Sequence, residues 1–233
     1  KKWSTRLASR TTTAPLVAGE RVFVLGVDRA VHAFDAIDGR RLWTQKRAGE
    51  ALTLAQPGVL SAYKNTLVAG VGAQMLGLDP TNGSVRWEVP VTSPRGTNEV
   101  ERLNDLVGPA LRLGDQFCAR AFQTAVGCVA IAGPDRASLR WSRLAGGQQA
   151  IGGDADYLFG ADGSDRLSAW KTPGGELAWS NERLLYRGLS APLSLGKAVV
   201  FGDADGQVHF LDRAEGRTLQ RLPTDGSAVV GQP

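Results

Sequence analysis

An internal repeat of four-stranded character is the feature that most limits how this chain can fold. Two markers recur independently along the sequence, a residue that opens each unit and a residue that closes it. The opening positions are Pro15, Pro57, Pro109, Ile151, Pro192 and Pro233. The closing positions are Trp3, Trp43, Trp87, Trp141, Trp179 and Gln220. Most intervals are close to 41 residues, a period typical of β-propeller blades.

The residues inside a unit favour strands joined by tight turns. Runs such as 22–25 and 199–201 are short and rich in β-branched and aromatic side chains. Pairs such as Asp38-Gly39 and Asn82-Gly83 supply the positive φ that a tight hairpin requires. The closing Trp is large enough to pack on the next unit. We therefore predict a single all-β domain over residues 1–233, a β-propeller of four-stranded antiparallel blades with about five and a half blades present.

Composition excludes several other classes of protein. Hydrophobic residues make up 42% and charged residues 21% of the 233, as in an ordinary globular protein. The net charge is +4, but Lys and Arg are scattered, so no nucleic-acid partner is expected. No apolar run approaches the roughly 20 residues that span a bilayer. No signal peptide precedes the first strand-like segment, so the chain is interpreted as a mature or excised piece.

Irregularities in the repeat indicate a working face. We name the four strands of a unit A to D, running from the propeller axis outward, so that D-to-A loops and B-to-C turns share one face. The segment from Trp87 to Pro109 is 22 residues long, whereas three equivalent segments have 12 to 14. The preceding D-to-A loop carries Leu52 and Leu54, which are either exposed or buried between blades. Both loops are predicted to lie side by side on that face.

The long segment has a helix-like portion. Residues 99–106 are predicted to form a turn of helix with Asn98 as its N-cap. Alternatively, the long segment only folds over its own blade and binds no partner.

Sequence motifs for metal or phosphate chemistry are missing. His32 and His209 occupy the same strand position in separate units and cannot form a metal-binding pair. Asp203 and Asp205 lack the Glu that would complete a calcium loop, so they are assigned to a B-to-C turn. No P-loop or nucleophile elbow is present.

Cys118 and Cys128 flank a predicted turn near residue 123 and would lie almost opposite each other on strands B and C. We expect them to form a disulfide in an oxidising compartment, and to be two buried thiols in a cytosol.

Two resemblances follow from these motifs. The units resemble the repeats of pyrroloquinoline-quinone dehydrogenases, but the adjacent cysteine pair and the calcium-binding acids of those enzymes are missing here. The stretch 96–105, the following Arg120-Ala121-Phe122 and the segment 184–192 resemble the BamB family of outer-membrane assembly factors. The alternatives to that second reading are a quinone-dehydrogenase propeller fragment and a propeller interaction module with another partner.

The BamB resemblance implies an eight-bladed propeller, of which this chain would be a fragment. It implies a non-enzymatic scaffold without a cofactor, on the periplasmic side of the outer membrane of a Gram-negative bacterium. The anchor would be an N-terminal lipid that is not present in this chain. The implied partners are the periplasmic domains of the barrel-forming subunit BamA and nascent outer-membrane proteins. Strand addition to exposed edges is the candidate mechanism for client binding.

The resemblance also implies site residues on the two irregular loops. A Leu-x-Leu-Arg segment of the family corresponds to Leu52, Leu54 and Ala55, so both leucines match and the Arg does not. Of two acidic residues in the family's other loop, Asp105 matches the first and Val107 stands near the second. Arg102 is a candidate to compensate for the missing polar contacts. The predicted partner-binding residues are therefore Leu52, Leu54, Arg102 and Asp105.

Overall fold

The computed structural model describes residues 2–47, 52–93 and 96–233, in which twenty strands form five sheets. We name the sheets blades 1 to 5. Blade 1 contains β1 (Leu16–Ala18), β2 (Arg21–Leu25), β3 (Ala30–Asp35) and β4 (Arg41–Lys46). Blade 2 contains β5 (Leu60–Tyr63), β6 (Thr66–Val71), β7 (Gln74–Leu78) and β8 (Val85–Pro90). Blade 3 contains β9 (Leu106–Leu113), β10 (Gln116–Ala121), β11 (Ala125–Gly133) and β12 (Arg136–Leu144). Blade 4 contains β13 (Gly152–Gly153), β14 (Tyr157–Ala161), β15 (Leu167–Lys171) and β16 (Leu177–Asn181). Blade 5 contains β17 (Leu193–Leu195), β18 (Ala198–Gly202), β19 (Gln207–Asp212) and β20 (Thr218–Pro223).

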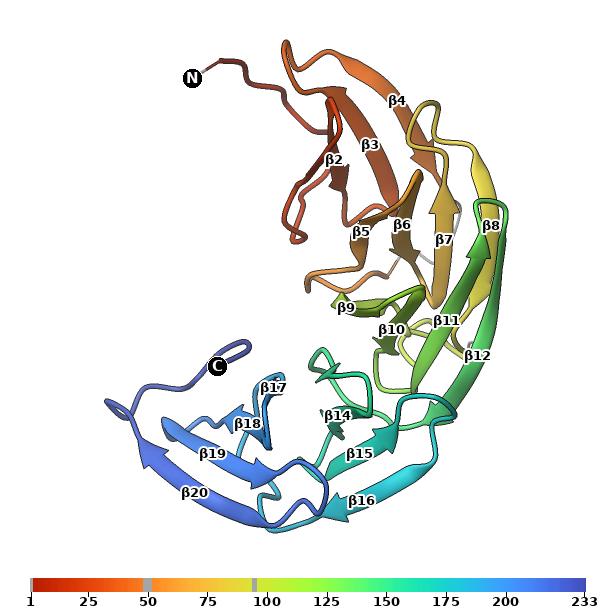
Figure 1. Ribbon diagram of the computed structural model, residues 1–233. Helices are drawn as coiled ribbons and strands as arrows, with labels where there is room; N and C mark the ends of the chain where they lie inside the picture. Colours follow the sequence, from red (N-terminus) through yellow and green to blue (C-terminus); the bar gives the residue numbers. More distant parts are fainter. Residues whose placement is uncertain (1, 48–51, 94–95) are drawn as a thin grey trace.

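The blades are arranged as an arc around a common centre (Figure 1). Every sheet follows chain order, and every pair of neighbouring strands is antiparallel. Inner strands such as β5, β9 and β17 face the centre, and outer strands such as β4, β12 and β20 form the rim (Figure 1). This confirms the predicted propeller of four-stranded antiparallel blades.

The segments on either side of the five blades contain no strand but keep the spacing of the repeat. In residues 2–13, the Nε1 of Trp3 donates to the carbonyl of Ala36 in blade 1, 3.1 Å away. In residues 224–233, the side-chain amide of Gln232 donates to the carbonyl of Pro192, 2.7 Å away. Trp3 thus stands where a closing Trp belongs, although the unit opening at Pro233 has no strand here.

The hydrophobic core lies between adjacent blades. One cluster joins Phe23 and Trp43 of blade 1 to Leu67 and Leu76 of blade 2, and comparable clusters fill the next three junctions. Phe23, Phe117, Phe159 and Phe201 each lie on the second strand of their blade, and all are buried. Burying these rings between sheets provides the main driving force for stacking the blades.

The closing Trp residues tie each blade to the next. Besides Trp3, the indole Nε1 of three of them donates to a carbonyl in the C-to-D turn of the following blade. These bonds are Trp43 to Pro80 at 3.0 Å, Trp141 to Thr172 at 2.8 Å and Trp179 to Arg213 at 2.9 Å. Under the rings lie the turn glycines Gly39, Gly83, Gly175 and Gly216, all with positive φ.

Trp87 is the exception among these residues. Its Nε1 is buried without a hydrogen-bond partner, and the ring lies over Gly77 of its own blade. The cause lies in blade 3, where β11 and β12 continue pairing out to Gly133 and Arg136. That longer hairpin replaces the Asp-Gly type of turn that receives the indole elsewhere.

No helix among the described residues is long and apolar enough to cross a membrane.

Candidate functional site

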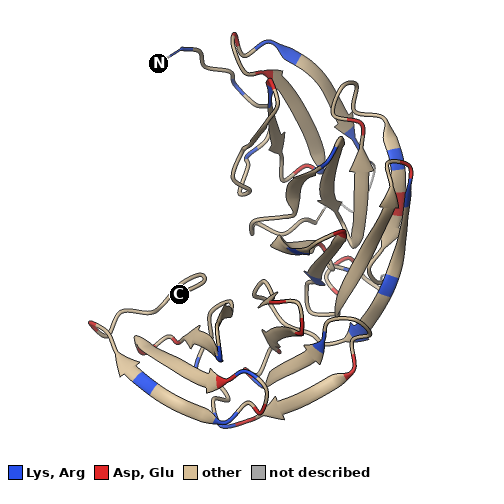
Figure 2. Cartoon of the chain, in the orientation of Figure 1, with Lys and Arg blue, Asp and Glu red and all other residues tan. Residues whose placement is uncertain are grey.

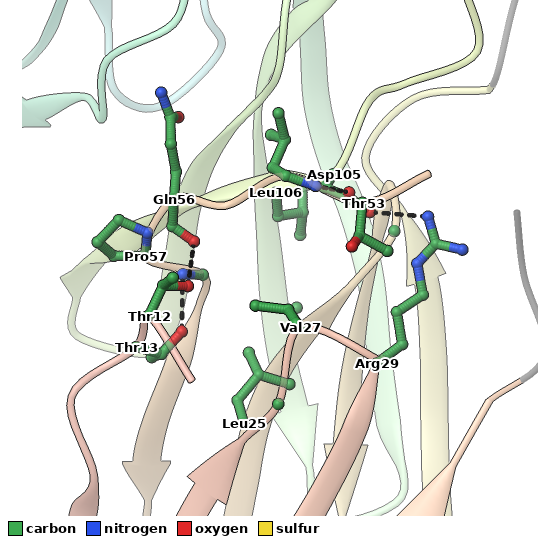
Figure 3. Close-up of a pocket in the computed structure, with 15 residues that line it drawn as sticks. Thr12, Thr13, Leu25, Val27, Arg29, Thr53, Gln56, Pro57, Asp105 and Leu106 are labelled. Atoms are coloured by element: carbon green, nitrogen blue, oxygen red, sulfur yellow. Dashed lines mark hydrogen bonds and ion pairs between the residues drawn. The ribbon is translucent and has the colours of Figure 1, made fainter. Parts of the chain in front are cut away.

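Asp105 joins the two irregular loops on one face of the propeller. Its Oδ2 accepts a hydrogen bond from the backbone amide of Leu54, 2.9 Å away. Its Oδ1 forms an ion pair with Arg29, whose Nη2 lies 3.1 Å away. The same Nη2 is 3.3 Å from the carbonyl oxygen of Leu52 and donates to it. Figure 3 shows Arg29 reaching toward Asp105 beside the backbone at Thr53. The predicted juxtaposition of the two loops is therefore present.

The chain around Asp105 is fixed by backbone hydrogen bonds. Asp105 immediately precedes the inner strand β9, and its carbonyl accepts from the amide of Phe122 at 3.0 Å. The next residue, Leu106, donates to the carbonyl of Gly72 at 2.8 Å. Arg29 sits in the turn between β2 and β3 with a φ of 61°, a left-handed conformation that few non-glycine residues adopt. Loops and turns from three blades thus converge on one carboxylate.

The two leucines of the site differ in exposure. Leu54 is half-buried and packs against a small cluster formed by Val107, Ala150 and Ala191, with Phe122 beside it. Leu52 is 37% exposed. Each of the two alternatives left open by the sequence therefore applies to one leucine.

The long insertion forms a single turn at residues 98–102, shorter than the predicted helical turn at 99–106, because Leu106 already belongs to β9. The amide of Arg102 donates to the carbonyl of Asn98 at 3.1 Å, and the Asn98 side chain caps the amide of Glu101 at 2.9 Å. Glu101 in turn accepts from the amide and hydroxyl of Thr97, which lowers the pKa of its carboxyl. Val100 is 72% exposed at the tip of this turn. Residues 48–51 and 94–95 of the two loops lie outside the described residues.

Arg102 lines a groove between blades 1 and 2 that Arg29 also lines. The groove encloses about 1010 Å³ and is lined by charged side chains that include Lys46, Arg47 and Glu88. Arg47 pairs with Glu88 across it. Val107, which stands near the family's second acidic residue, is buried in β9, whereas Ala55 is exposed. The site therefore has one acidic group where the family pattern has two.

A small pocket lies beneath the two loops. It measures about 50 Å³ and is bounded by Thr12, Thr13, Gln56 and Pro57 together with Asp105 (Figure 3). Within the described ranges, no group of three or more His, Cys, Asp or Glu side chains is placed to hold a metal ion.

The remaining titratable candidates have structural partners. His32 hydrogen-bonds Thr44 at 3.0 Å within blade 1. Asp203 begins the predicted B-to-C turn and is fully buried. It accepts from His209 at 2.7 Å and from Arg187 at 2.6 Å. Burial would raise the pKa of Asp203, but these hydrogen bonds outweigh it and leave the pKa below its ordinary value.

Arg120 is a further buried charge that the sequence did not reveal. It has no exposed surface and donates to the carbonyls of Ala145 and Gly146 at 2.8 and 2.7 Å. Burial lowers the pKa of its guanidinium to about 10. The side chain closes the junction between blades 3 and 4, packed against Gly147 and Gly160.

Cys118 and Cys128 are directly opposite each other on β10 and β11. They are joined by a disulfide, with their Cα atoms 4.0 Å apart, and both are fully buried. The bond ties the two middle strands of blade 3 below the long insertion.

The five four-stranded blades define a PQQ-like β-propeller. A family model described as outer membrane protein assembly factor BamB matches residues 1–162 and 138–231. Proteins with that name from Bordetella pertussis and Burkholderia pseudomallei are each 33% identical over 100% and 99% of this chain. The chain belongs to the BamB family. It spans 60% of the length of each of these two relatives.

Solved structures agree with this fold. The crystal structure of BamB from Moraxella catarrhalis superposes with a TM-score of 0.89 at 23% identity, covering 99% of this chain and 69% of that one. A quinohemoprotein alcohol dehydrogenase from Comamonas testosteroni gives a TM-score of 0.65 at 12% identity, covering 95% and 46%. At these identities the likeness shows a shared propeller fold.

Proposed function

We propose that this chain is a non-enzymatic scaffold of the outer-membrane β-barrel assembly machinery that binds the periplasmic domains of BamA. Membership of the family supports the assembly role, because its relatives are named as outer membrane assembly factors. The observation that carries the proposal is the paired loops, where Leu52 is exposed and its loop is fastened to the next one through Asp105. The site of action would be the periplasmic side of the outer membrane, reached through a lipid anchor.

The proposed docking surface has the composition of a protein interface. Leu52 and Val100 are exposed on the two loops, and Glu99, Glu101 and Arg102 lie on the same loop as Val100. Interfaces between proteins commonly combine an apolar centre with a polar rim. Lys and Arg are spread over all five blades and do not gather in one stripe in the view of Figure 2. This distribution supports a protein partner over a nucleic acid.

The disulfide supports an oxidising compartment. Such bonds persist in the bacterial periplasm and are rare in the cytosol. Nascent outer-membrane proteins are the proposed clients, because they cross that compartment before they are inserted.

The quinone-dehydrogenase alternative has less support from the site. The two cysteines are ten residues apart and lie inside one blade, away from the pocket beneath the loops.

A titration of BamA periplasmic domains tests the proposal. The Leu52→Glu variant places a charge at the centre of the surface and is expected to weaken binding at least tenfold, because burying an unpaired charge is costly. Leu219→Glu is the matched control, since Leu219 is 44% exposed on the outer strand β20. Binding by the unmutated chain and by Leu219→Glu, but not by Leu52→Glu, supports the proposal. Equal binding by all three removes the site assignment.

A further inference from the structure

We infer that Arg29 and Asp105 form a clamp that positions the loop of Leu52, so that both act on the partner through the loop and not by touching it. This inference rests on the proposed function and assigns a separate role to each residue of the site. Leu52 is the contact residue, Leu54 is the anchor, and Arg29 is a positioning residue that the family pattern did not single out.

The clamp is a short chain of contacts through one carboxylate. One oxygen of Asp105 holds the amide of Leu54 and the other holds the guanidinium of Arg29. Arg29 also donates to the carbonyl of Leu52, so the backbone is held on both sides of Thr53. Hydrogen bonds of this kind, with a charged donor or acceptor, are stronger than neutral ones.

Burial separates the clamp from the contact surface. The side chains of Arg29 and Asp105 are only 13% and 15% exposed, and most of their polar surface is engaged within the protein. Leu54 is half-buried against Val107 and Ala191. Leu52 is the most exposed of these four residues and is left to face a partner. A loop held in its bound conformation binds more tightly because less conformational entropy is lost on association.

The backbone conformation of Arg29 allows a substitution that removes the contacts of its side chain and keeps the turn. Its φ of 61° is tolerated by Asn, so Arg29→Asn removes the guanidinium without new backbone strain. Arg29→Lys keeps the positive charge but has a single ammonium in place of a planar fork, and is expected to restore part of the effect.

Hydrogen exchange at the Leu54 amide tests the clamp in the chain alone, without a partner. Loss of a charge-assisted hydrogen bond in Arg29→Asn or Asp105→Asn is expected to speed exchange there about tenfold, with Arg29→Lys in between. Leu52→Ser should leave this exchange rate unchanged. Unchanged exchange in both Arg29→Asn and Asp105→Asn would overturn the clamp.

Titration of BamA periplasmic domains with the same variants separates positioning from contact. Arg29→Asn, Arg29→Lys and Asp105→Asn should weaken binding in the order of their exchange rates. Leu52→Ser should weaken binding without changing exchange at the Leu54 amide. Weaker binding by Arg29→Asn with normal exchange would make Arg29 a contact residue and contradict the inference. If the unmutated chain fails to bind, the proposed function fails for this chain, and exchange at Leu54 still decides whether the clamp exists.

Discussion

The indole Nε1 of Trp43 donates a hydrogen bond to the carbonyl of Pro80, 3.0 Å away, and so connects the outer strand of blade 1 to a turn of blade 2. The turn glycine Gly83 lies directly under the ring. The same arrangement recurs at three other junctions and is missing at Trp87. This contrast gives the chain an internal control for what the Trp contact contributes.

Replacing Trp43 by Phe is expected to destabilise the chain more than replacing Trp87 by Phe. Both changes remove similar ring volume, but only Trp43→Phe breaks a hydrogen bond, worth about 1–2 kcal/mol. Urea unfolding followed by circular dichroism measures the difference. Equal losses of stability in the two variants would show that the interblade hydrogen bond contributes nothing.

Gly83→Ala should be more harmful than Gly19→Ala, although both positions have positive φ. A Cβ at residue 83 would lie 2.6 Å from the Cε3 atom of Trp43, whereas a Cβ at residue 19 meets nothing within 4 Å. Backbone strain costs each variant about 1–2 kcal/mol, and overpacking adds about 1–3 kcal/mol at Gly83. Thermal unfolding of the two proteins compares them, and matching midpoints would refute the packing argument.

Removing the disulfide is expected to lower the free energy of unfolding. The bond closes a loop of ten residues, for which loss of chain entropy in the unfolded state predicts about 2–3 kcal/mol. Alanine is the suitable replacement at Cys118 and Cys128, because both sites are fully buried. Unfolding with and without a reductant is the measurement. The free energy of unfolding of the double variant should not change with the reductant. An unmutated chain whose free energy of unfolding also stays unchanged would contradict the prediction.

Stability should fall in acid through Asp79, which closes the turn under Trp43. Hydrogen bonds from the hydroxyl and amide of Thr81, followed by one from Arg86, lower the pKa of this carboxyl to about 2. Since the folded pKa lies below the unfolded value of about 3.9, the stabilisation is complete above pH about 4 and is lost as the pH falls toward about 2. Asp79→Asn should flatten this part of the curve of stability against pH. A variant curve parallel to that of the unmutated chain would argue against the assignment.

The fold could be predicted from the sequence because its determinants are local and repeated. A strand-forming run recurs in each unit, a glycine in a tight turn and a closing Trp recur in most of them, and each marks its own place in the blade. The long hairpin of β11 and β12 escaped prediction, because blade 3 lacks the glycine turn that marks the others. The single turn at residues 98–102 was predictable from its Asn cap.

The candidate site was only partly predictable. Irregular spacing identified the two loops, but Arg29 contacts Asp105 across 76 residues of sequence and from another blade. Nothing in the local pattern separates it from a surface arginine. Asp203 was assigned to its turn, but the burial of Arg120 and Asp203 was not predicted, since a buried charge is recognised by partners that only the folded chain assembles. The division between exposed Leu52 and half-buried Leu54 likewise depends on packing against blades 3 and 4.

Site-specific photo-crosslinking tests whether the loop of Leu52 contacts the periplasmic domains of BamA. A photoreactive residue is placed at position 52 in one protein and at position 219 in another, and each is irradiated with BamA periplasmic domains. Both positions carry exposed leucines, but only the first lies on the paired loops. We expect a crosslinked product from position 52 and none from position 219. A product from position 219 alone would place the partner on the rim of blade 5 and contradict the proposed docking surface on the paired loops.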